Sequence, residues 1–190
     1  NKSFCLIVFL LMDISQKNIV MDTNPKLRVN STDFDINNIT NNEKEVIDFM
    51  VSYIDACYYD LCEKYQISPG IAIAAPQAGL NKKVIYLHFD NDDKEYQYLL
   101  ANPEIVKKSE TIAYLSYGEG CLSVQGHIEG YVPRYAEITV KAYDLNRHKN
   151  IEIKAKGLLS ICLQHEIDHL YGKLYYDHIN KNDPFHAEPN

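Results

Sequence analysis

Apolar side chains recur every three or four residues between positions 43 and 65, which is the spacing of one face of an α-helix. The apolar positions on this face are Val46, Met50, Ile54, Cys57, Leu61 and Tyr65. Thr40 lies three residues before Glu43, the spacing of a capping box at a helix start. The pattern therefore predicts one long helix near the N-terminal end, with its apolar face packed against the core.

Shorter apolar and β-branched runs follow this helix and predict strands. They span 71–75, 84–89, 96–101, 136–143 and 151–155, and the last two alternate apolar and polar residues. A second helix is predicted over about 158–171, with Gly157 before it and Gly172 after it, where a glycine commonly ends a helix. Two helices among many short strands predict the α+β class, with mainly antiparallel sheets packed around the second helix.

The two ends of the chain differ from this patterned centre. Residues 13–42 are polar and rich in asparagine, and we expect an extended arm there. Residues 4–12 form an apolar run too short to span a bilayer. Because no small-x-small cleavage site follows this run, we favour a natural or added extension over a signal peptide for residues 1–12. One domain is then expected over residues 13–184, followed by a loose tail at 185–190.

The composition agrees with a globular domain and narrows the classes of partner that it can bind. The 190 residues are 46% hydrophobic and 24% charged, as in ordinary globular proteins. The net charge of −7 argues against a nucleic-acid partner, because a surface that binds nucleic acid needs clustered Lys and Arg. An odd number of cysteines does not suggest a disulfide framework, and reduced thiols in a cytoplasm fit better. The five are Cys5, Cys57, Cys62, Cys121 and Cys162.

The strongest chemical signal is an H-E-x-x-H pattern in the second predicted helix, from His165 to His169. Positions i and i+4 lie on one helix face, about 6 Å apart along the axis, so both imidazoles can reach one metal ion. Glu166, beside the first histidine, can accept a proton from a water at that ion. The alternative is an ordinary polar helix face. The apolar neighbours of the pattern disfavour it, because unpaired charge in a core is costly.

A metal site of this kind needs a third protein ligand. The position six residues after His169 is Tyr175 rather than histidine, and the chain beyond it is too short to offer a ligand on a later helix. Cys162 shares the helix, but about 10 Å of helix axis separates it from His169, so we interpret it as a pocket wall or core thiol. Cys121, in a segment with two glycines, is the favoured candidate.

A third segment, 70–77, combines small residues with Gln77 at its end. Small side chains leave room for a substrate backbone, and the Gln77 amide can donate a hydrogen bond. A buried strand that ends in a turn explains this segment equally well, so it carries little weight alone.

Together the three segments resemble the peptide deformylase family. The family patterns are G-x-G-x-A-A-x-Q, E-G-C-L-S and Q-H-E-x-D-H-L, in this order. They occur here at 70–77, 119–123 and 164–170, with Ala72 in place of the second glycine. The resemblance extends over roughly residues 18–184, and the stretch 130–134 is similar to the form found in Gram-positive bacteria and mycoplasmas.

This resemblance implies a hydrolase that removes the formyl group from N-formylmethionine of nascent polypeptides and releases formate. It implies the α+β fold predicted above and one divalent metal ion. Ferrous iron is the implied ion, and zinc, nickel or cobalt can substitute for it. The implied ligands are Cys121, His165 and His169.

The resemblance also implies roles for the residues around the metal. Glu166 accepts the proton of water and passes it to the leaving amine, while the Gln77 amide and the Leu122 backbone N–H bind the oxyanion. The methionine side chain and the peptide contact Gly70, Ile71, Ala72, Leu158, Ile161 and Cys162. Because Ala72 adds a methyl group where the family has glycine, we expect modestly less room near the formyl group.

The implied partners are N-formylmethionyl nascent peptides at the ribosome of a bacterial cytoplasm, with no direct contact with nucleic acid or membrane. A zinc endopeptidase shares H-E-x-x-H and is the main alternative, although an upstream cysteine ligand argues against it. A non-catalytic structural metal site is a second alternative. Structural sites usually have four protein ligands, whereas three are found here.

Overall fold

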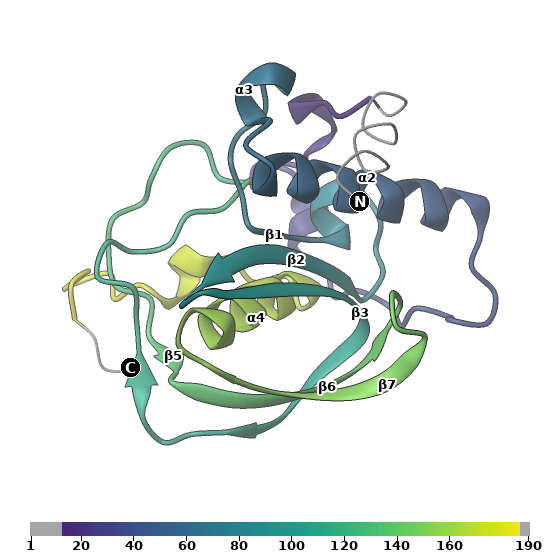
Figure 1. The fold of residues 1–190 in the computed structure, drawn as a ribbon. Coiled ribbons are helices and arrows are strands. Elements are labelled where there is room, and N and C mark those ends of the chain that lie inside the picture. Colours follow the sequence, from purple (N-terminus) through teal and green to yellow (C-terminus); the bar gives the residue numbers. More distant parts are fainter. Residues whose placement is uncertain (1–12, 187–190) are drawn as a thin grey trace.

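The computed structural model describes residues 13–186, in which a curved antiparallel sheet lies between two helices (Figure 1). The sheet has five strands in the order β1-β2-β3-β6-β7, and every neighbouring pair is antiparallel. The predicted extension at 1–12 and residues 187–190 of the predicted tail lie outside the described residues. The α+β class with mainly antiparallel pairing is confirmed.

The bounds of the elements are as follows. The strands are β1 (Ala72–Ala74), β2 (Val84–Asn91), β3 (Lys94–Lys108), β4 (Ile112–Ala113), β5 (Arg134–Tyr135), β6 (Glu137–Asp144) and β7 (Lys149–Lys156). The α-helices are α2 (Asn41–Tyr58), α3 (Cys62–Tyr65) and α4 (Gly157–Leu170). Four short 3₁₀ turns are η1 (Gln16–Asn18), η2 (Pro25–Arg28), η3 (Ala75–Ala78) and η4 (Tyr175–His178). No helix within residues 13–186 combines the length and apolar character needed to cross a bilayer.

Strand β2 is buried on both faces and so joins the two helices into one core. Val84 and Tyr86 pack in the cluster that contains the apolar side of α2. Ile85 and Leu87, which alternate with them, pack in the cluster that contains α4. Each fully buried aliphatic side chain stabilises the fold by about 1.5–3 kcal/mol. The sheet therefore holds α4 at a fixed distance from β1, and these two elements form opposite sides of the site.

Helix α2 begins as the sequence predicts but ends early. Thr40 and Glu43 form the reciprocal capping box. The helix ends at Tyr58, so the predicted continuation to residue 65 is wrong. Asp60 adopts a left-handed conformation with φ 59°. The N–H of residue 60 bonds to Cys57 O and that of residue 61 to Ala56 O, which is a Schellman motif, and α3 then starts in a new direction.

Helix α4 is buried on nearly every side, because it lies in the concavity of the sheet (Figure 1). It ends in a second Schellman motif around Gly172, which has φ 69°. A Cβ atom on Gly172 would lie 2.6 Å from the backbone of Arg28, so only glycine allows this close approach. The end of α4 is thereby fixed against the N-terminal segment.

The segment 13–42 is not the extended arm expected from its polar composition. Ile14, Ile19, Leu27 and Phe34 are all buried in it. The segment also carries η1 and η2, each capped by a side chain that accepts a backbone N–H. Its apolar residues are too widely and irregularly spaced to produce a periodic pattern, which is why the sequence gives no sign of their burial.

Candidate active site

Three side chains predicted to share a metal ion meet in the structure. One ligand atom each from Cys121, His165 and His169 lies within 4.8 Å of the other two. Cys121 Sγ is 3.4 Å from His169 Nε2. The two histidines lie on one face of α4, with ring centroids 5.1 Å apart, as their spacing of four residues requires. Cys162 is not part of this group.

The segment that carries Cys121 is held against η3 by a buried glutamine. Gln77 Oε1 accepts the backbone N–H of Ala74 at 2.9 Å, which turns its amide nitrogen toward Cys121. Nε2 donates to Ser123 Oγ at 3.1 Å and lies 3.4 Å from Cys121 Sγ. Gln77 therefore positions the thiol as well as lining the cavity.

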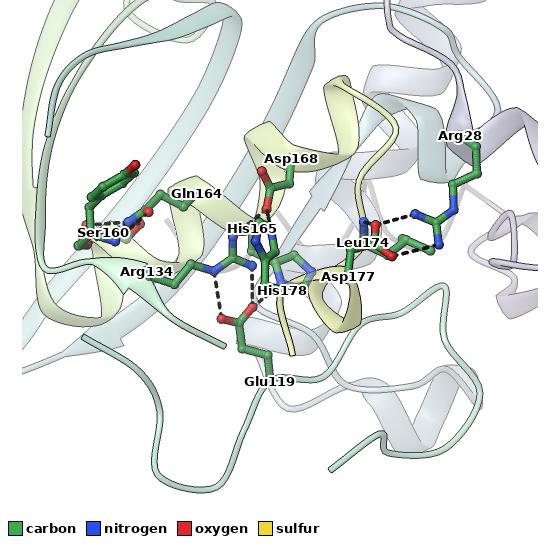
Figure 2. Close-up of polar contacts among 11 residues, drawn as sticks. Arg28, Glu119, Arg134, Ser160, Gln164, His165, Asp168, Leu174, Asp177 and His178 are labelled. Atoms are coloured by element: carbon green, nitrogen blue, oxygen red, sulfur yellow. Dashed lines mark hydrogen bonds and ion pairs between the residues drawn. The ribbon is translucent and has the colours of Figure 1, made fainter. Parts of the chain in front are cut away.

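A buried ion-pair network fixes the first histidine (Figure 2). His165 Nδ1 donates to Glu119 Oε1 at 2.7 Å, which leaves Nε2 to face the cluster. Arg134 donates to both oxygens of Glu119, at 3.0 and 2.8 Å, and its other branch donates to Asp168 at 2.5 Å. His178 lies 2.7 Å from the same Asp168 oxygen. Four charged or titratable groups thus position one imidazole ring.

The pKa shifts follow from these contacts. Burial opposes ionisation of Glu119, but hydrogen bonds from His165 and Arg134 outweigh it and lower the pKa of Glu119 to about 2. Burial also opposes the charge of His165, yet its bonds with Cys121 and Glu119 raise its pKa to about 10. Burial and the nearby positive charge of His165 lower the pKa of His169 well below its usual value. These surroundings favour the positively charged form of His165 and the neutral form of His169.

Glu166 lies beside the cluster with part of its carboxylate unpaired. Its side chain is buried, and Oε2 has no hydrogen-bond partner among the described residues. Burial raises the pKa of Glu166 to about 7, although His165 opposes that shift. His169 Nδ1 is likewise buried and unpaired. Buried polar atoms are rarely left without partners, so the unpaired Oε2 of Glu166, a residue that lines the cavity, indicates a site that takes a ligand.

A cavity of about 930 Å³ opens onto Glu166 and His165. Every residue predicted to bind substrate lines it, namely Gly70, Ile71, Ala72, Leu158, Ile161 and Cys162. Ile71 is 41% exposed, whereas Cys162 is buried in the wall. A side chain on Gly70 would crowd Leu122, because a Cβ there would lie 3.0 Å from the end of the Leu122 side chain. The backbone N–H of Leu122, also on the wall, donates to no group within residues 13–186.

The donor set fits a divalent first-row metal ion. A thiol and two imidazoles suit such ions, and three protein ligands leave a coordination position open. The hydrogen bond from the first imidazole to a carboxylate is the arrangement usual for metal-bound histidine.

Several residues of the site were not assigned a role from the sequence. Arg134, Asp168, Ser123 and His178 act through other residues rather than facing the cavity. Glu119, Ser123 and Asp168 do lie inside the family patterns, and Arg134 ends the stretch 130–134. The sequence shows that these residues lie in a pattern. It does not show their hydrogen-bond partners, because those partners lie far along the chain and are brought close only by folding.

Comparison with known proteins agrees with this geometry. The profile of the family described as Polypeptide deformylase matches residues 16–185. Peptide deformylase of Ureaplasma parvum serovar 3 is 47% identical over 171 residues, covering 90% of this chain and 86% of the relative. That of Malacoplasma penetrans is 44% identical over 183 residues, covering 96% and 98%. The crystal structure of peptide deformylase from Ehrlichia chaffeensis superposes with a TM-score of 0.68 at 29% identity, covering 86% of this chain and 88% of that one.

Proposed function

Because the chain belongs to the peptide deformylase family, it is an amide hydrolase that removes the N-formyl group from nascent peptides, and we propose that the cluster of Cys121, His165 and His169 is its metal centre. The observation that carries the proposal is the meeting of these three ligand atoms within 4.8 Å beside the unpaired carboxylate of Glu166. Residues 13–184 then form one catalytic domain, with α4 as its central helix.

The ion that fits this proposal best is ferrous iron, and zinc, nickel or cobalt can replace it. When bound, such an ion polarises a carbonyl and lowers the pKa of a coordinated water to about 7. Cys121 binds as a thiolate and both histidines bind as neutral imidazoles, so the ligands lose their protons on binding. Glu119 keeps Nδ1 of His165 protonated, and Nε2 is therefore the nitrogen that can bind.

Glu166 acts as the general base and then as the general acid. A buried carboxylate with a pKa raised to about 7 can both accept a proton from water and return it near neutral pH. We assign the attacking water to the unpaired Oε2 of Glu166. The proton then goes to the amine that leaves when the formyl C–N bond breaks, which gives formate and a free α-amino group.

Two N–H donors on the cavity wall stabilise the developing oxyanion. One is the backbone N–H of Leu122, which has no other acceptor within residues 13–186. The other is Nε2 of Gln77, whose amide is oriented by the bond from Ala74. Loss of one such donor typically lowers the turnover of amide hydrolases by about 10²–10³-fold.

The substrate occupies the apolar part of the cavity. The methionine side chain contacts Ile71 on the β1 side and Leu158, Ile161 and Cys162 on the α4 side, which all line the cavity. Strand β1 lies at the edge of the five-stranded sheet, so a peptide backbone can pair with Gly70 to Ala72 without displacing another strand. Ala72 is itself buried beside the cavity, and its methyl group narrows the space near the formyl group.

The decisive experiment compares two substrates on the metal-loaded enzyme. A formylated methionine dipeptide should release formate, whereas an unformylated peptide of ordinary length should remain intact. Internal cleavage without formate release would instead favour the zinc endopeptidase. Binding of metal without either reaction would favour a structural site. We also infer that the enzyme acts in a bacterial cytoplasm on chains emerging from the ribosome, without binding nucleic acid or membrane itself.

A further inference from the structure

Part of the 930 Å³ cavity is lined by residues that have no role in the mechanism above. They come from the N-terminal segment, from α2 and from the segment before β1, and are Gln16, Met21, Cys57, Ser68 and Pro69. None of the five belongs to the metal cluster or to the residues predicted to bind substrate. Since cavities of about 300–1,000 Å³ enclose whole drug-sized ligands, this one has room for more than one methionine.

The open edge of β1 can pair with a peptide at Ala72. Ile71 O accepts the His88 N–H at 2.9 Å, so Ile71 bonds toward β2. Because neighbouring residues of a strand bond to opposite sides, Ala72 turns its N–H and C=O to the open edge. The next N–H on this edge, that of Ala74, already donates to Gln77 Oε1 at 2.9 Å. Pairing along this edge therefore stops before Ala74.

The position of the metal cluster sets the direction of the peptide. Gln77 Nε2 lies 3.4 Å from Cys121 Sγ, so a formyl group at the cluster lies at the Gln77 end of this edge. The residues after methionine therefore run antiparallel to β1. Since paired strands advance together at about 3.3 Å per residue, a methionine opposite Ala72 brings the fourth and fifth residues to Pro69 and Ser68.

The backbone of Ser68 has no free group left for a peptide. Its N–H donates to Gln16 Oε1 at 2.9 Å, and its carbonyl oxygen lies 2.9 Å from the Tyr53 hydroxyl and 3.6 Å from Cys57 Sγ. The Tyr53 hydroxyl is also 2.6 Å from Gln16 Oε1. Because an N–H donor faces this oxygen, the amide of Gln16 has one orientation, with Nε2 directed away from Ser68. That nitrogen donates to no group within residues 13–186.

The turn that carries Gln16 is held in place. Gln16 is the first residue of η1, and the preceding Ser15 caps this turn by accepting the Lys17 N–H at 3.3 Å. Ile14 and Ile19, on either side of the turn, are buried in the core. A donor fixed in this way loses little conformational freedom when it binds a ligand.

We propose that Gln16 extends the peptide-binding edge of β1, and that its amide nitrogen donates to a backbone carbonyl of the fourth or fifth substrate residue. Its Oε1 takes the Ser68 N–H, and Nε2 offers a new N–H in place of the one that Ser68 has used. Met21, which packs with Leu122 against the core, adds apolar surface to the same cavity. The ligand is thus an extended peptide bound through its backbone, whatever its sequence. This assignment rests on the proposed function.

Peptide length tests this subsite. Formate release is measured on the metal-loaded enzyme for formyl-Met peptides of three and five residues, with alanine after methionine and an amidated C-terminus. The longer peptide should have a KM about 3–10-fold lower at similar kcat, as expected for one added hydrogen bond between uncharged groups. Equal KM values would overturn the proposal. Absence of formate release from both peptides would instead contradict the proposed function.

Gln16→Glu separates the donor from the structural role of this side chain. A carboxylate keeps an oxygen for the Ser68 N–H and the Tyr53 hydroxyl but has no N–H of its own. The variant should keep the parental KM for the three-residue peptide and lose the gain from five residues. Asn18→Asp, the same chemical change on an exposed side chain of η1, is the matched control and should keep the gain.

Two outcomes for the variant would overturn the assignment. If Gln16→Glu keeps the gain, another group binds the longer peptide. If the KM rises equally for both lengths, Gln16 only supports the fold around Ser68. Gln16→Met, which keeps the length of the side chain without an N–H, replaces the first variant if the latter does not fold.

Discussion

Two buried polar clusters of this molecule differ in how completely their hydrogen bonds are satisfied. Both ring nitrogens of His88 face carboxylates, Nδ1 at 2.7 Å from Asp55 and Nε2 at 2.8 Å from Glu95. Tyr58 stacks on the same ring with centroids 3.6 Å apart. Around the H-E-x-x-H pattern, by contrast, Glu166 Oε2 and His169 Nδ1 have no partner. They are two of the three buried side-chain atoms left unpaired in residues 13–186.

The difference distinguishes a polar cluster that supports the fold from a polar cluster that can bind a ligand. None of the residues around His88 lines the cavity, and their mutual contacts join α2 to the β2–β3 hairpin. A satisfied network stabilises the fold and has no capacity left for a ligand. Of the two unpaired atoms, Glu166 Oε2 belongs to a residue that lines the cavity. An unpaired buried atom costs stability, and proteins retain one mainly where function requires it.

The largest expected effect is at the unsatisfied cluster. Glu166→Gln keeps the shape of the side chain but removes the base, and turnover should fall by about 10²–10⁴-fold. Formate release and metal content are measured together, since the ion should remain bound. Glu95→Gln is the matched control from the satisfied cluster and should leave turnover unchanged. Persistent activity in the first variant would remove Glu166 from the mechanism.

The next effect concerns stability and is pH-dependent. Burial opposes the charge of His88, but hydrogen bonds with Asp55 and Glu95 outweigh it and raise its pKa above the usual 6.5. The charged form is therefore favoured in the folded state. Its contribution is fully present below pH 6.5 and is lost as the pH rises through the folded pKa.

His88→Gln should accordingly lower the free energy of unfolding by about 3 kcal/mol at pH 6, with turnover retained. Urea unfolding of both proteins at several pH values measures the difference, which should shrink toward high pH. A difference that grows with pH would mean that His88 is neutral in the folded protein. A loss of turnover in a variant that is still fully folded would show that the cluster around His88 and the cluster around Glu166 are not independent.

A smaller effect is expected at the network around the first histidine. Glu119→Gln preserves size but removes the charge that faces His165 and Arg134, and metal affinity should fall about 10–100-fold. Competition with a chelator gives the affinity, and circular dichroism checks that the fold is intact. Equal affinity in both proteins would reduce Glu119 to a purely structural role.

The smallest effect is at the cavity wall. Ala72→Gly removes one methyl group, so kcat/KM for a formyl-Met peptide should stay within about twofold of the parent or rise slightly. Because glycine is less favourable within a strand, stability should fall by roughly 0.5–1 kcal/mol. A clearly lower kcat/KM at full folding would mean that the methyl group supports the substrate rather than crowding it.

The sequence predicts best what depends on local spacing. The capping box of Thr40 and Glu43 and the two histidines one turn apart are short-range features, and the structure has both. Cys121 could be chosen by elimination, because few residues can complete a metal site. The six predicted substrate residues also line the cavity, but that prediction rested on family resemblance rather than on spacing.

What the sequence does not predict depends on contacts between distant residues. The sequence does not reveal the break after Tyr58, because the apolar spacing continues past it, whereas in the structure Asp60 takes a left-handed conformation that ends the helix. The burial of Leu27 and Phe34 needs partners that lie far along the chain. Likewise, the bonds from Arg134 to Glu119 and Asp168 span 15 and 34 residues, beyond the reach of any periodic pattern.

The close approach of Gly172 to Arg28 joins an early part of the chain to a late one. Arg28 donates to Asp177 at 2.5 Å and to the Gly172 carbonyl at 3.3 Å, and the Ser31 N–H donates to Leu170 O at 2.8 Å. The stretch around Arg28 therefore lacks these partners until α4 and η4 have been synthesised, whereas Val20, Asp22 and Thr32 on either side of it bond to residues between 77 and 123. An enzyme that acts on the first residue of other chains thus completes the contacts of its own Arg28 only after α4 and η4 have emerged from the ribosome.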